Sequence, residues 1–388
     1  MKPKSILLVS NYYPPEQGAA PNRIQVLAKA LYAQGYKVQV VCPLPNYPTG
    51  KVFSAFSGRF YSKRIEEGIS VHRLWLWPSK STNKFIRLFS MLSFAKSLAF
   101  FFILKRIPKL VFVQYSPVFV GFTAVFWSWL FGKKTIVNVS DLWPLAGLEM
   151  GLLKKGVYYS LLEKMEGFCY QKADLTLGQS EEILNHIQAK NSKAELFLYR
   201  NFPNFSPSEI IPKTPQLPIK IVYAGLLGMA QGLSEIFSKI TVPEHIEFHV
   251  YGDGPDAETI SKPKNLKVIY HGSISRNELH KELLQYDIAF IPLVNRIYGS
   301  VPSKIFEYAR LGLPLLYMAG GEGGDLIKKH QLGWVVSVQD FEALQEFLNT
   351  IDVSEVQKFP KVLQQQKAIQ TFDFSVQFEE LKKKLKAL

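Results

Sequence analysis

The segment Tyr298–Tyr308 gathers residue types that can bind an anion. Pro302 precedes a predicted helix, so Ser303 and Lys304 would lie in its first turn. A lysine at this position opposes the helix dipole unless an anion occupies the free N–H groups. Glu307 would follow on the same face and could accept hydrogen bonds from a ribose diol. A simple Lys–Glu helix pair is the alternative, but the residue types together favour a diphosphate site.

Two glycine-rich segments follow predicted strands in the same half of the chain. One reads AGLLGMAQGL and contains Gly225 and Gln231; the other reads YGDGP and contains Gly252 and Asp253. Backbone N–H groups in such loops can approach a phosphate closely, because glycine has no side chain. Ordinary structural turns have the same composition. The sequence contains neither G-x-G-x-x-G nor G-x-x-x-x-G-K-[ST], which weakens a dinucleotide or P-loop interpretation.

Short β-rich runs alternate with helical patterns along both halves of the chain. The predicted strands of the first half are Ile6–Ser10, Tyr36–Cys42, Val71–Leu76, Leu110–Gln114, Thr135–Val139, Leu175–Leu177 and Leu196–Tyr199. Those of the second half are Ile219–Ala224, Ile246–Tyr251, Val268–His271, Ile288–Pro292, Leu315–Met318 and Trp334–Val336. Between them, Asn22–Gln34 has helical spacing, and Ser275 with Glu278 predicts a capping box. This alternation is typical of α/β proteins with parallel, doubly wound sheets.

A proline-rich segment divides this alternation in two. Residues 201–218 contain five prolines and support no regular element, so we interpret them as a linker. We therefore expect a first Rossmann-like domain over residues 1–205 and a second over 206–372. A C-terminal helix over 373–388 is expected to pack back on the first domain. Ligands bind at the carboxyl ends of strands in such sheets, and we expect the two domains to face a shared cleft.

The positive charge of the chain is confined to its first half. The 388 residues carry a formal net charge of +14, yet residues 1–205 hold 26 Lys and Arg against 11 Asp and Glu, and residues 206–388 hold 20 against 21. Residues 68–140 include ten basic residues, no acidic ones and many aromatic ones. This mixture suits an anionic membrane surface better than nucleic acid. A solvated basic face over an aromatic core is the alternative.

No segment is predicted to cross a membrane. Residues 110–132 are uncharged but contain a short strand pattern and Pro117, which favours a buried strand followed by a buried helix. The run Phe85–Leu104 is interrupted by Arg87 and Lys96, as in a helix lying at a membrane interface. The N-terminus lacks the apolar region of a signal peptide. We therefore expect a cytoplasmic protein, bound peripherally to the inner face of the plasma membrane.

Cysteine and histidine usage excludes two classes of site. Two cysteines cannot form a disulfide framework, and the seven histidines are scattered without the spacing of metal ligands. No Asp-x-Asp triplet occurs in the chain. We therefore expect no metal and no cofactor.

Five motifs together resemble a known family. They are NYYPPEQGAA from Asn11, Asp141-Leu-Trp-Pro, YAG…AQGL around Gly225, YGDG from Tyr251 and PSKIFEY from Pro302. In combination they resemble the retaining nucleotide-sugar glycosyltransferases of family 4, which have the GT-B fold, and the resemblance covers essentially the whole chain. The second and last motifs are most similar to the branch that transfers L-fucosamine-type and related amino sugars in O-antigen and capsule assembly.

The resemblance implies a donor site in the second domain and an acceptor site in the first. Glu307 would hold the ribose, Ser303 and Lys304 the diphosphate, and the strand end at His271 would lie near the base. The donor-binding residues implied in this way are Gly225, Gln231, Gly252, Asp253, His271, Ile274, Ser303, Lys304 and Glu307. Glu16, Gly18, Ala19 and Asp141 would face the acceptor and the transferring sugar. Asp141, Lys304 and Glu307 are the expected catalytic residues, with Asp141 alternatively serving as a helix N-cap.

Some positions depart from the family pattern. The first of the family's usual two glutamates is replaced by Gly299, and a common Arg…Lys phosphate pair by Leu226 or Leu227 and Gln231. The remaining candidates for neutralising the diphosphate are Lys304, the helix N-termini, Arg296 and Arg200. Ser140 stands where a histidine is usual, so no histidine base is expected there.

These observations predict a metal-independent transferase. The expected reaction moves a sugar, taken to be an N-acetylated amino sugar on UDP, from the nucleotide to a lipid-linked saccharide in cell-surface polysaccharide assembly. Nucleic acid is not an expected partner. Two other functions stay open at this point: a sugar-nucleotide 2-epimerase, which has a similar architecture, and a non-enzymatic protein that binds polyanions or a membrane surface.

Overall fold

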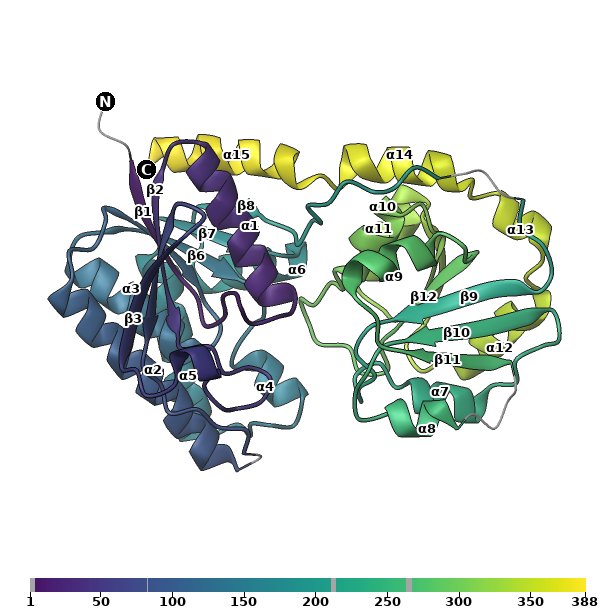
Figure 1. Ribbon diagram of the computed structural model, residues 1–388, viewed down its shortest axis with the longest axis horizontal. Coiled ribbons are helices and arrows are strands. Elements are labelled where there is room, and N and C mark those ends of the chain that lie inside the picture. Colours follow the sequence, from purple (N-terminus) through teal and green to yellow (C-terminus); the bar gives the residue numbers. More distant parts are fainter. Residues whose placement is uncertain (1–3, 82, 211–213, 263–266) are drawn as a thin grey trace. The chain divides into compact units, whose positions relative to one another are not determined.

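Residues 4–81, 83–210, 214–262 and 267–388 are described by a computed structural model, in which the chain forms two α/β units (Figure 1). Unit 1 comprises the chain up to Arg200 together with the C-terminal segment Phe378–Leu388. Unit 2 is Asn201–Gln377. The first boundary therefore lies five residues before the position expected from the prolines. Aromatic packing explains this difference, because the Phe205 ring lies 4.3 Å from that of His280 in unit 2.

Unit 1 contains an eight-stranded sheet in the order β3-β4-β2-β1-β5-β6-β7-β8. The strands are β1 (Ser5–Val9), β2 (Lys37–Pro43), β3 (Tyr61–Glu66), β4 (Ile69–Leu74), β5 (Leu110–Gln114), β6 (Lys134–Val139), β7 (Leu175–Gly178) and β8 (Leu196–Leu198). All neighbouring strands pair in parallel except β3 and β4. The seven strands predicted for this half are present, each within two residues of its predicted ends.

Strand β3 was not predicted, and it forms an antiparallel hairpin with β4. Its loop is the dipeptide Glu67-Gly68, and both residues have positive φ angles, 49° and 80°. A two-residue turn of this kind matches the twist of the strands that it joins. Most of β3 is solvent-exposed, and Lys63 and Arg64 give it the charged surface expected of an edge strand. Its polar composition is why β3 lacks the apolar signal of the other strands.

The helices of unit 1 are α1 (Ala19–Ala33), α2 (Lys84–Leu104), α3 (Val118–Leu130), α4 (Leu145–Glu149), α5 (Val157–Lys172), α6 (Glu181–Lys190) and α15 (Phe374–Ala387). Helix α3 contacts both α2 and α5. Most of α15 belongs to unit 1, as predicted: Leu381 and Leu385 are buried, Lys382 donates to Gln34 over 3.1 Å, and Lys384 pairs with Glu195.

Unit 2 contains a fully parallel six-stranded sheet in the order β11-β10-β9-β12-β13-β14. The strands are β9 (Ile219–Ala224), β10 (Ile246–Tyr251), β11 (Val268–Gly272), β12 (Ile288–Pro292), β13 (Leu315–Met318) and β14 (Gly333–Val336). The helices are α7 (Leu233–Lys239), α8 (Ala257–Ser261), α9 (Arg276–Leu283), α10 (Lys304–Arg310), α11 (Glu322–His330), α12 (Phe341–Thr350), α13 (Val353–Gln357) and α14 (Lys361–Thr371). Each predicted strand is present within one residue of its predicted ends, and Ser275 and Glu278 form the predicted capping box.

Both faces of this second sheet are buried. Alternate residues of β9 enter different apolar clusters: Ile219 and Ile221 join residues of α7 and α12, whereas Val222 and Ala224 join residues of α9, α10 and α11. A parallel strand buried on both sides is expected to be continuously apolar, as β9 is. The unit is therefore doubly wound, as Figure 1 also shows.

Arg310, the last residue of α10, binds both segments that connect the two units. Its Nε donates to the carbonyl of Phe205 over 3.0 Å, and its Nη1 pairs with Asp373 over 3.0 Å. Phe205 lies just after the first crossing between units, and Asp373 just before the second. Arg310 is buried, so this cation with its partners fixes the end of α10 in unit 2.

Packing of α15 can be tested by truncating one of its buried side chains. Leu381→Ala removes a fully buried side chain and should cost about 2–5 kcal/mol of stability, measured by chemical denaturation. Leu363→Ala on α14 is the matched control, because Leu363 is 60% exposed and its truncation should cost well under about 1 kcal/mol. Equal effects of the two changes would mean that α15 does not pack as described.

Candidate functional site

Helix α10 begins where the sequence predicts, after the loop that follows β12. Ser303 occupies the N-cap position without capping the helix through its side chain, and Lys304 is the first helical residue. Glu307 follows one turn later. All three residues are partly buried. The start of α10 thus presents a hydroxyl, an ammonium and a carboxylate within one helical turn.

The Lys304 ammonium lies against the end of β9. Its Nζ donates to the Tyr308 hydroxyl over 3.2 Å and lies 5.3 Å from the centre of the Tyr223 ring. A Cβ atom built on Gly225 would come within 2.2 Å of this Nζ, so the lysine occupies the space that the glycine leaves. Burial lowers the pKa of Lys304 to about 8; Glu307 opposes this shift and Arg276 adds to it.

The Glu307 carboxylate is held by two residues of α9. Its Oε1 accepts from Arg276 Nη2 over 2.9 Å, from Arg276 Nε over 3.2 Å and from His280 Nε2 over 2.8 Å. Burial would raise the pKa of Glu307, but the His280 hydrogen bond and the charges of Arg276 and Lys304 together lower it to about 2. Glu307 is therefore a carboxylate held in place by α9. Of its two oxygens, which are expected to bind a ribose, Oε1 already accepts hydrogen bonds from the protein.

Arg276 and His280 were not identified from the sequence. They lie four residues apart on one face of α9, beginning at the residue after the capping-box Ser275, and that spacing was the available signal. Their partner is about thirty residues away in the chain. Pairing at such a distance depends on how α9 and α10 pack, which local patterns do not specify.

The two glycine-rich loops pack directly on each other. The Gly225 N–H donates to the Tyr251 carbonyl over 2.9 Å, and a Cβ on Gly252 would come within 1.8 Å of the Gly225 carbonyl oxygen. Gly225 and Gly252 have φ angles of 152° and 137°, which favour glycine. Close packing thus explains these glycines without a ligand. Both loops lie at the carboxyl edge of the sheet, and the Gly225 loop contacts Lys304.

Gln231 and Asp253 are placed differently. Asp253 is exposed and accepts the N–H of Gly254 over 2.8 Å, which shapes its own loop. The Oε1 of Gln231 is buried and has no hydrogen-bond partner among the described residues. A buried amide oxygen without a partner is costly, so Gln231 remains available to a donor group of a ligand.

His271 stands at the exposed end of β11, within a stack of rings. Its ring is parallel to that of Tyr251 at 4.4 Å, and its Nε2 lies 2.9 Å from Nδ1 of His249. Burial lowers the pKa of His271, with Glu282 opposing the shift. Ile274 is partly buried against an apolar cluster of the unit. An exposed, neutral imidazole on an aromatic stack offers a flat surface of the kind that a nucleobase stacks on.

In unit 1, Asp141 follows β6 and is exposed. It does not cap a helix, because the N-cap of α4 is Pro144. Its neighbour Ser140 accepts from Arg23 over 3.0 Å and from Gln114 over 2.6 Å. Desolvation by the surrounding protein raises the pKa of Asp141, and the Arg23 guanidinium opposes this shift. Arg23, on the first turns of α1, was not identified from the sequence.

The carboxylate of Glu16 is bonded to the backbone of a neighbouring loop. It is buried, and its Oε1 accepts the N–H groups of Asn46 over 2.8 Å and Tyr47 over 2.9 Å. Burial raises its pKa, and these two hydrogen bonds oppose the shift. Gly18 is the N-cap of α1 and Ala19 its first residue. Glu16 therefore acts on the loop after β2, whereas Gly18 and Ala19 lie at the start of α1, three residues before the predicted helix start at Asn22.

The two other candidate cations have separate positions. The Arg296 guanidinium packs on Gly321, the N-cap of α11, because a Cβ there would come within 2.1 Å of it. Arg200 belongs to unit 1 and donates to the Gln179 carbonyl over 3.3 Å. Within unit 2, Lys304 and Arg276 are thus the cations next to Glu307.

Comparisons with known proteins assign both units to families. Residues 18–199 match the model of the glycosyl transferase 4-like domain, and residues 219–351 match that of the glycosyl transferases group 1. The chain is built from two glycosyltransferase domains. We refer to them below as the 4-like domain and the group 1 domain.

One curated relative and several solved structures are similar to this chain. The putative colanic acid biosynthesis glycosyl transferase WcaI of Escherichia coli K12 is 25% identical over 278 residues, covering 66% of this chain and 68% of the relative. Sucrose-phosphate synthase of Thermosynechococcus elongatus is 13% identical with a TM-score of 0.73 and 99% coverage of both chains. Anabaena HepE in complex with UDP-glucose is 13% identical with a TM-score of 0.66, covering 99% of this chain and 100% of that one. These structures establish the GT-B fold predicted from the sequence.

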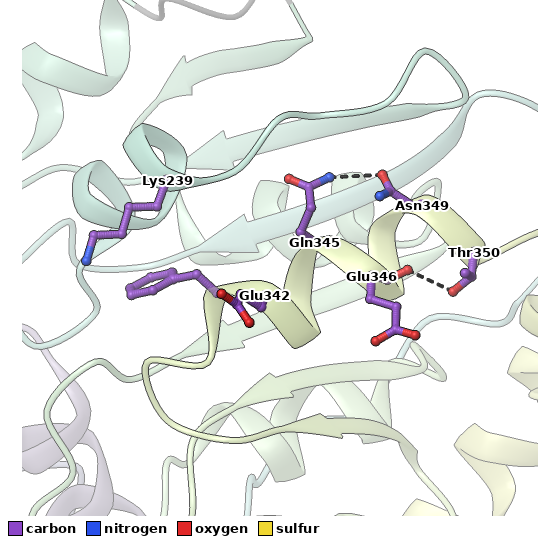
Figure 2. A pocket seen from close by; sticks show the side chains of 7 residues that line it. Lys239, Glu342, Gln345, Glu346, Asn349 and Thr350 are labelled. Atoms are coloured by element: carbon purple, nitrogen blue, oxygen red, sulfur yellow. Dashed lines mark hydrogen bonds between the residues drawn. The ribbon is translucent and has the colours of Figure 1, made fainter.

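Other features of the described residues lie apart from this site. A hollow of about 500 Å³ in the group 1 domain is lined by residues of α7 and α12, including Lys239, Glu342 and Gln345 (Figure 2). Lys239 packs 4.3 Å from the Phe341 ring centre, and Gln345 donates to Asn349. None of the expected site residues lines it. Across the described ranges, no helix is long and apolar enough to span a membrane, and no cluster of three potential metal ligands occurs.

Glu307 should contribute pH-dependent stability to the group 1 domain. Its pKa in the folded chain, about 2, is below its ordinary value of 4.5, so the stabilisation is fully present above pH 4.5 and is lost as the pH falls toward 2. Glu307→Gln should cost about 1–3 kcal/mol at pH 7, measured by urea denaturation. The difference from the unmodified chain should shrink through that acid window.

Glu258→Gln provides the control for this experiment. Glu258 forms an exposed pair with Lys262, and such pairs contribute little. A loss for Glu307→Gln that is equal at pH 7 and pH 3 would contradict the described ion pairs.

Proposed function

We propose that this chain transfers a sugar from a nucleoside diphosphate to a lipid-linked saccharide, retaining the configuration at the anomeric carbon. The observation that carries the proposal is the position of Lys304. Its ammonium lies against Gly225, at the carboxyl edge of a parallel sheet, and Glu307 follows one helical turn later. That edge is where ligands bind in such sheets, and the sheet belongs to a group 1 glycosyltransferase domain.

The role of Lys304 follows from the charge that the reaction develops. The bond between the anomeric carbon and the diphosphate oxygen breaks, leaving positive charge on the sugar and negative charge on the phosphate. Lys304 stabilises that negative charge, together with the N–H groups at the start of α10. The acceptor hydroxyl then bonds to the anomeric carbon on the same face, and its proton passes to the departing diphosphate. No divalent metal is part of this proposal.

A bound diphosphate would also change the protonation of Lys304. With a pKa of about 8, the Lys304 side chain of the ligand-free protein is mostly protonated at pH 7. Opposite charge nearby favours the charged form, so the diphosphate would raise this pKa. Glu307 would accept from the ribose, and His271 with Ile274 would lie near the base. We propose uridine as the base, a proposal supported by Anabaena HepE, whose structure contains UDP-glucose.

On the acceptor side, Asp141 is the candidate for orienting the attacking hydroxyl or stabilising the cationic sugar. It is exposed, its pKa is raised, and it caps no helix. The 25% identical WcaI is described as a colanic acid biosynthesis enzyme, which supports a cell-surface polysaccharide as the product. The transfer of an N-acetylated amino sugar rests on the motif resemblance. The comparisons do not favour a 2-epimerase or a non-enzymatic polyanion-binding protein.

The donor site can be tested with a thermal-stability screen over nucleoside diphosphates. UDP should raise the melting temperature, because a ligand at a hundredfold excess over Kd stabilises the folded state by about 2.7 kcal/mol. Lys304→Ala should lower kcat about 10²-fold or more, and added EDTA should leave turnover unchanged. Lys262→Ala is the control, since Lys262 is an exposed lysine of the same domain. A Lys304→Ala enzyme with near-normal kcat would remove the proposed role.

The 4-like domain carries an exposed apolar face suited to the membrane where such an acceptor resides. On α2, Phe85 is 81% exposed and Leu104 74%; on α5, Val157 is 91% exposed. Trp129 near the end of α3 is also exposed, and α3 contacts both neighbouring helices. Large exposed apolar side chains on a set of helices of which α3 contacts the other two are consistent with an interaction surface.

The charges on and after α2 favour an anionic bilayer as its partner. Lys96, Lys105, Arg106 and Lys109 are all exposed. Each basic residue near an anionic surface contributes about 1 kcal/mol, while aromatic rings settle at the headgroup level. We therefore propose peripheral binding to the cytoplasmic face of the plasma membrane through α2, α3 and α5.

Vesicle sedimentation tests this membrane face. The chain should bind vesicles containing phosphatidylglycerol at low salt and bind pure phosphatidylcholine at least tenfold more weakly. Phe100→Ser combined with Leu104→Ser should reduce binding to the anionic vesicles by about tenfold. Leu363→Ser with Val376→Ser is the control pair, because both side chains are exposed on other helices. Failure of the unmodified chain to bind anionic vesicles would refute the membrane proposal.

A further inference from the structure

A second hollow lies in the 4-like domain, in the loops after two neighbouring strands. Its volume is about 610 Å³, within the range of small-molecule sites. Residues after β2, including Lys51 and Phe60, form one side, and Trp75 and Pro78 after β4 form the other. Because β2 and β4 pair in parallel, both loops leave the sheet at its carboxyl edge. We call this hollow the loop pocket.

Two aromatic rings form a surface at the loop pocket. Phe60 is 76% exposed, and its ring stacks with that of Trp75 at an interplanar angle of 30°, with centres 6.1 Å apart. The backbone joins the two residues as well, since the Trp75 N–H donates to the Phe60 carbonyl over 3.0 Å. An aromatic face of this kind attracts polarised C–H groups, such as those on one side of a pyranose ring, and repels anions lying directly above it.

The charged lining of the loop pocket has one sign. Among the described residues that line it, Lys51 and Arg59 are charged, both are exposed, and none is acidic. Arg59 and Phe60 are consecutive in the chain, and both line the loop pocket together with Trp75. Cations beside an apolar ring surface suit a ligand that carries an anionic group on an otherwise C–H-rich ring.

A buried carboxylate holds one side of the loop pocket in place. The Oε1 of Glu16 accepts the N–H groups of Asn46 and Tyr47, at the start of the loop that leads to Lys51. Another buried group, Arg73, reaches the same N-terminal segment by donating to the Pro14 carbonyl over 2.6 Å. This support by buried charged groups shows that the loop is built to a fixed shape.

We propose that the loop pocket binds the acceptor through a sugar ring bearing an anionic group. Phe60 and Trp75 contact the C–H face of the sugar, and Lys51 and Arg59 bind the anion. The anion is either the phosphate that links the sugar to its lipid or the carboxylate of an acidic sugar. The role of this ligand as the acceptor rests on the proposed function, whereas binding of an anionic sugar can be measured independently of it.

Saturation-transfer NMR with millimolar probes tests the loop pocket directly. The probes are glucose 1-phosphate, glucuronic acid and glucose, each with excess UDP present to occupy the donor site. At least one anionic sugar should receive strong saturation, and the double variant Arg59→Gln, Phe60→Ala should reduce it at least fivefold. Glucose 1-phosphate alone would identify a phosphate-bearing acceptor, and glucuronic acid alone an acidic sugar.

The matched control is the double variant Lys63→Gln, Ile65→Ala on β3. It removes the same charge and a side chain that is 77% exposed, from residues that do not line the pocket, and should leave saturation unchanged. Equal signals from both variants, equal binding of glucose, or saturation of neither anionic sugar would overturn the proposal.

Failure of the loop pocket and failure of the proposed function give different results. The pocket variant should keep the UDP-dependent rise in melting temperature, because its substitutions lie in the 4-like domain. Loss of anionic-sugar binding with UDP stabilisation intact supports the pocket. Absence of any UDP effect in the unmodified chain would instead refute the transferase donor site, while the sugar measurement would still decide the pocket.

Discussion

The hydroxyl group of Tyr308 determines the geometry of the candidate donor site. It accepts the N–H of Ala224 over 3.2 Å, donates to the carbonyl of the same residue over 2.7 Å and accepts from Lys304. Its one donor and both acceptor positions are thereby used. Tyr308 is buried, so a loss of these partners would leave an unsatisfied polar group. The end of β9 and the start of α10 are consequently held in one arrangement, with Lys304 above Gly225.

This clamp makes glycine necessary at the next position. Any side chain at Gly225 would enter the space of the Lys304 ammonium, and Gly252 is packed just as closely against the Gly225 carbonyl. The packing of the two glycine-rich loops and the position of Lys304 therefore depend on one another. The sequence indicates each part separately, and the structure shows why they occur together.

Strands buried on both faces could be predicted accurately from the sequence. The ends of β5, β9, β10, β12 and β13 agree with the predicted ends, because continuous apolar runs bounded by turn residues have few other solutions. Strand β3 was missed since it is a polar edge strand, recognisable only from its Glu67-Gly68 turn. The linker boundary shifted because Phe202 and Phe205 pack on unit 2, a tertiary preference that proline content does not reveal.

The part of the candidate site that lies within one local sequence motif could be predicted. Ser303, Lys304 and Glu307 lie at the start of one helix, as their spacing indicates. Arg276, His280 and Arg23 were missed because each acts on a partner far along the chain. Glu16 was chosen as a residue facing the acceptor, and the structure instead shows its carboxylate bonded to two backbone N–H groups. Whether the two domains share a cleft stays a prediction.

Helix α10 has only seven residues, and its two ends have different attachments. Lys304 is its first residue. Arg310, its last residue, binds the carbonyl of Phe205 and the carboxylate of Asp373, which lie on the two segments that connect the domains. Through Arg310, both connecting segments are thereby attached to the same short helix that begins at Lys304.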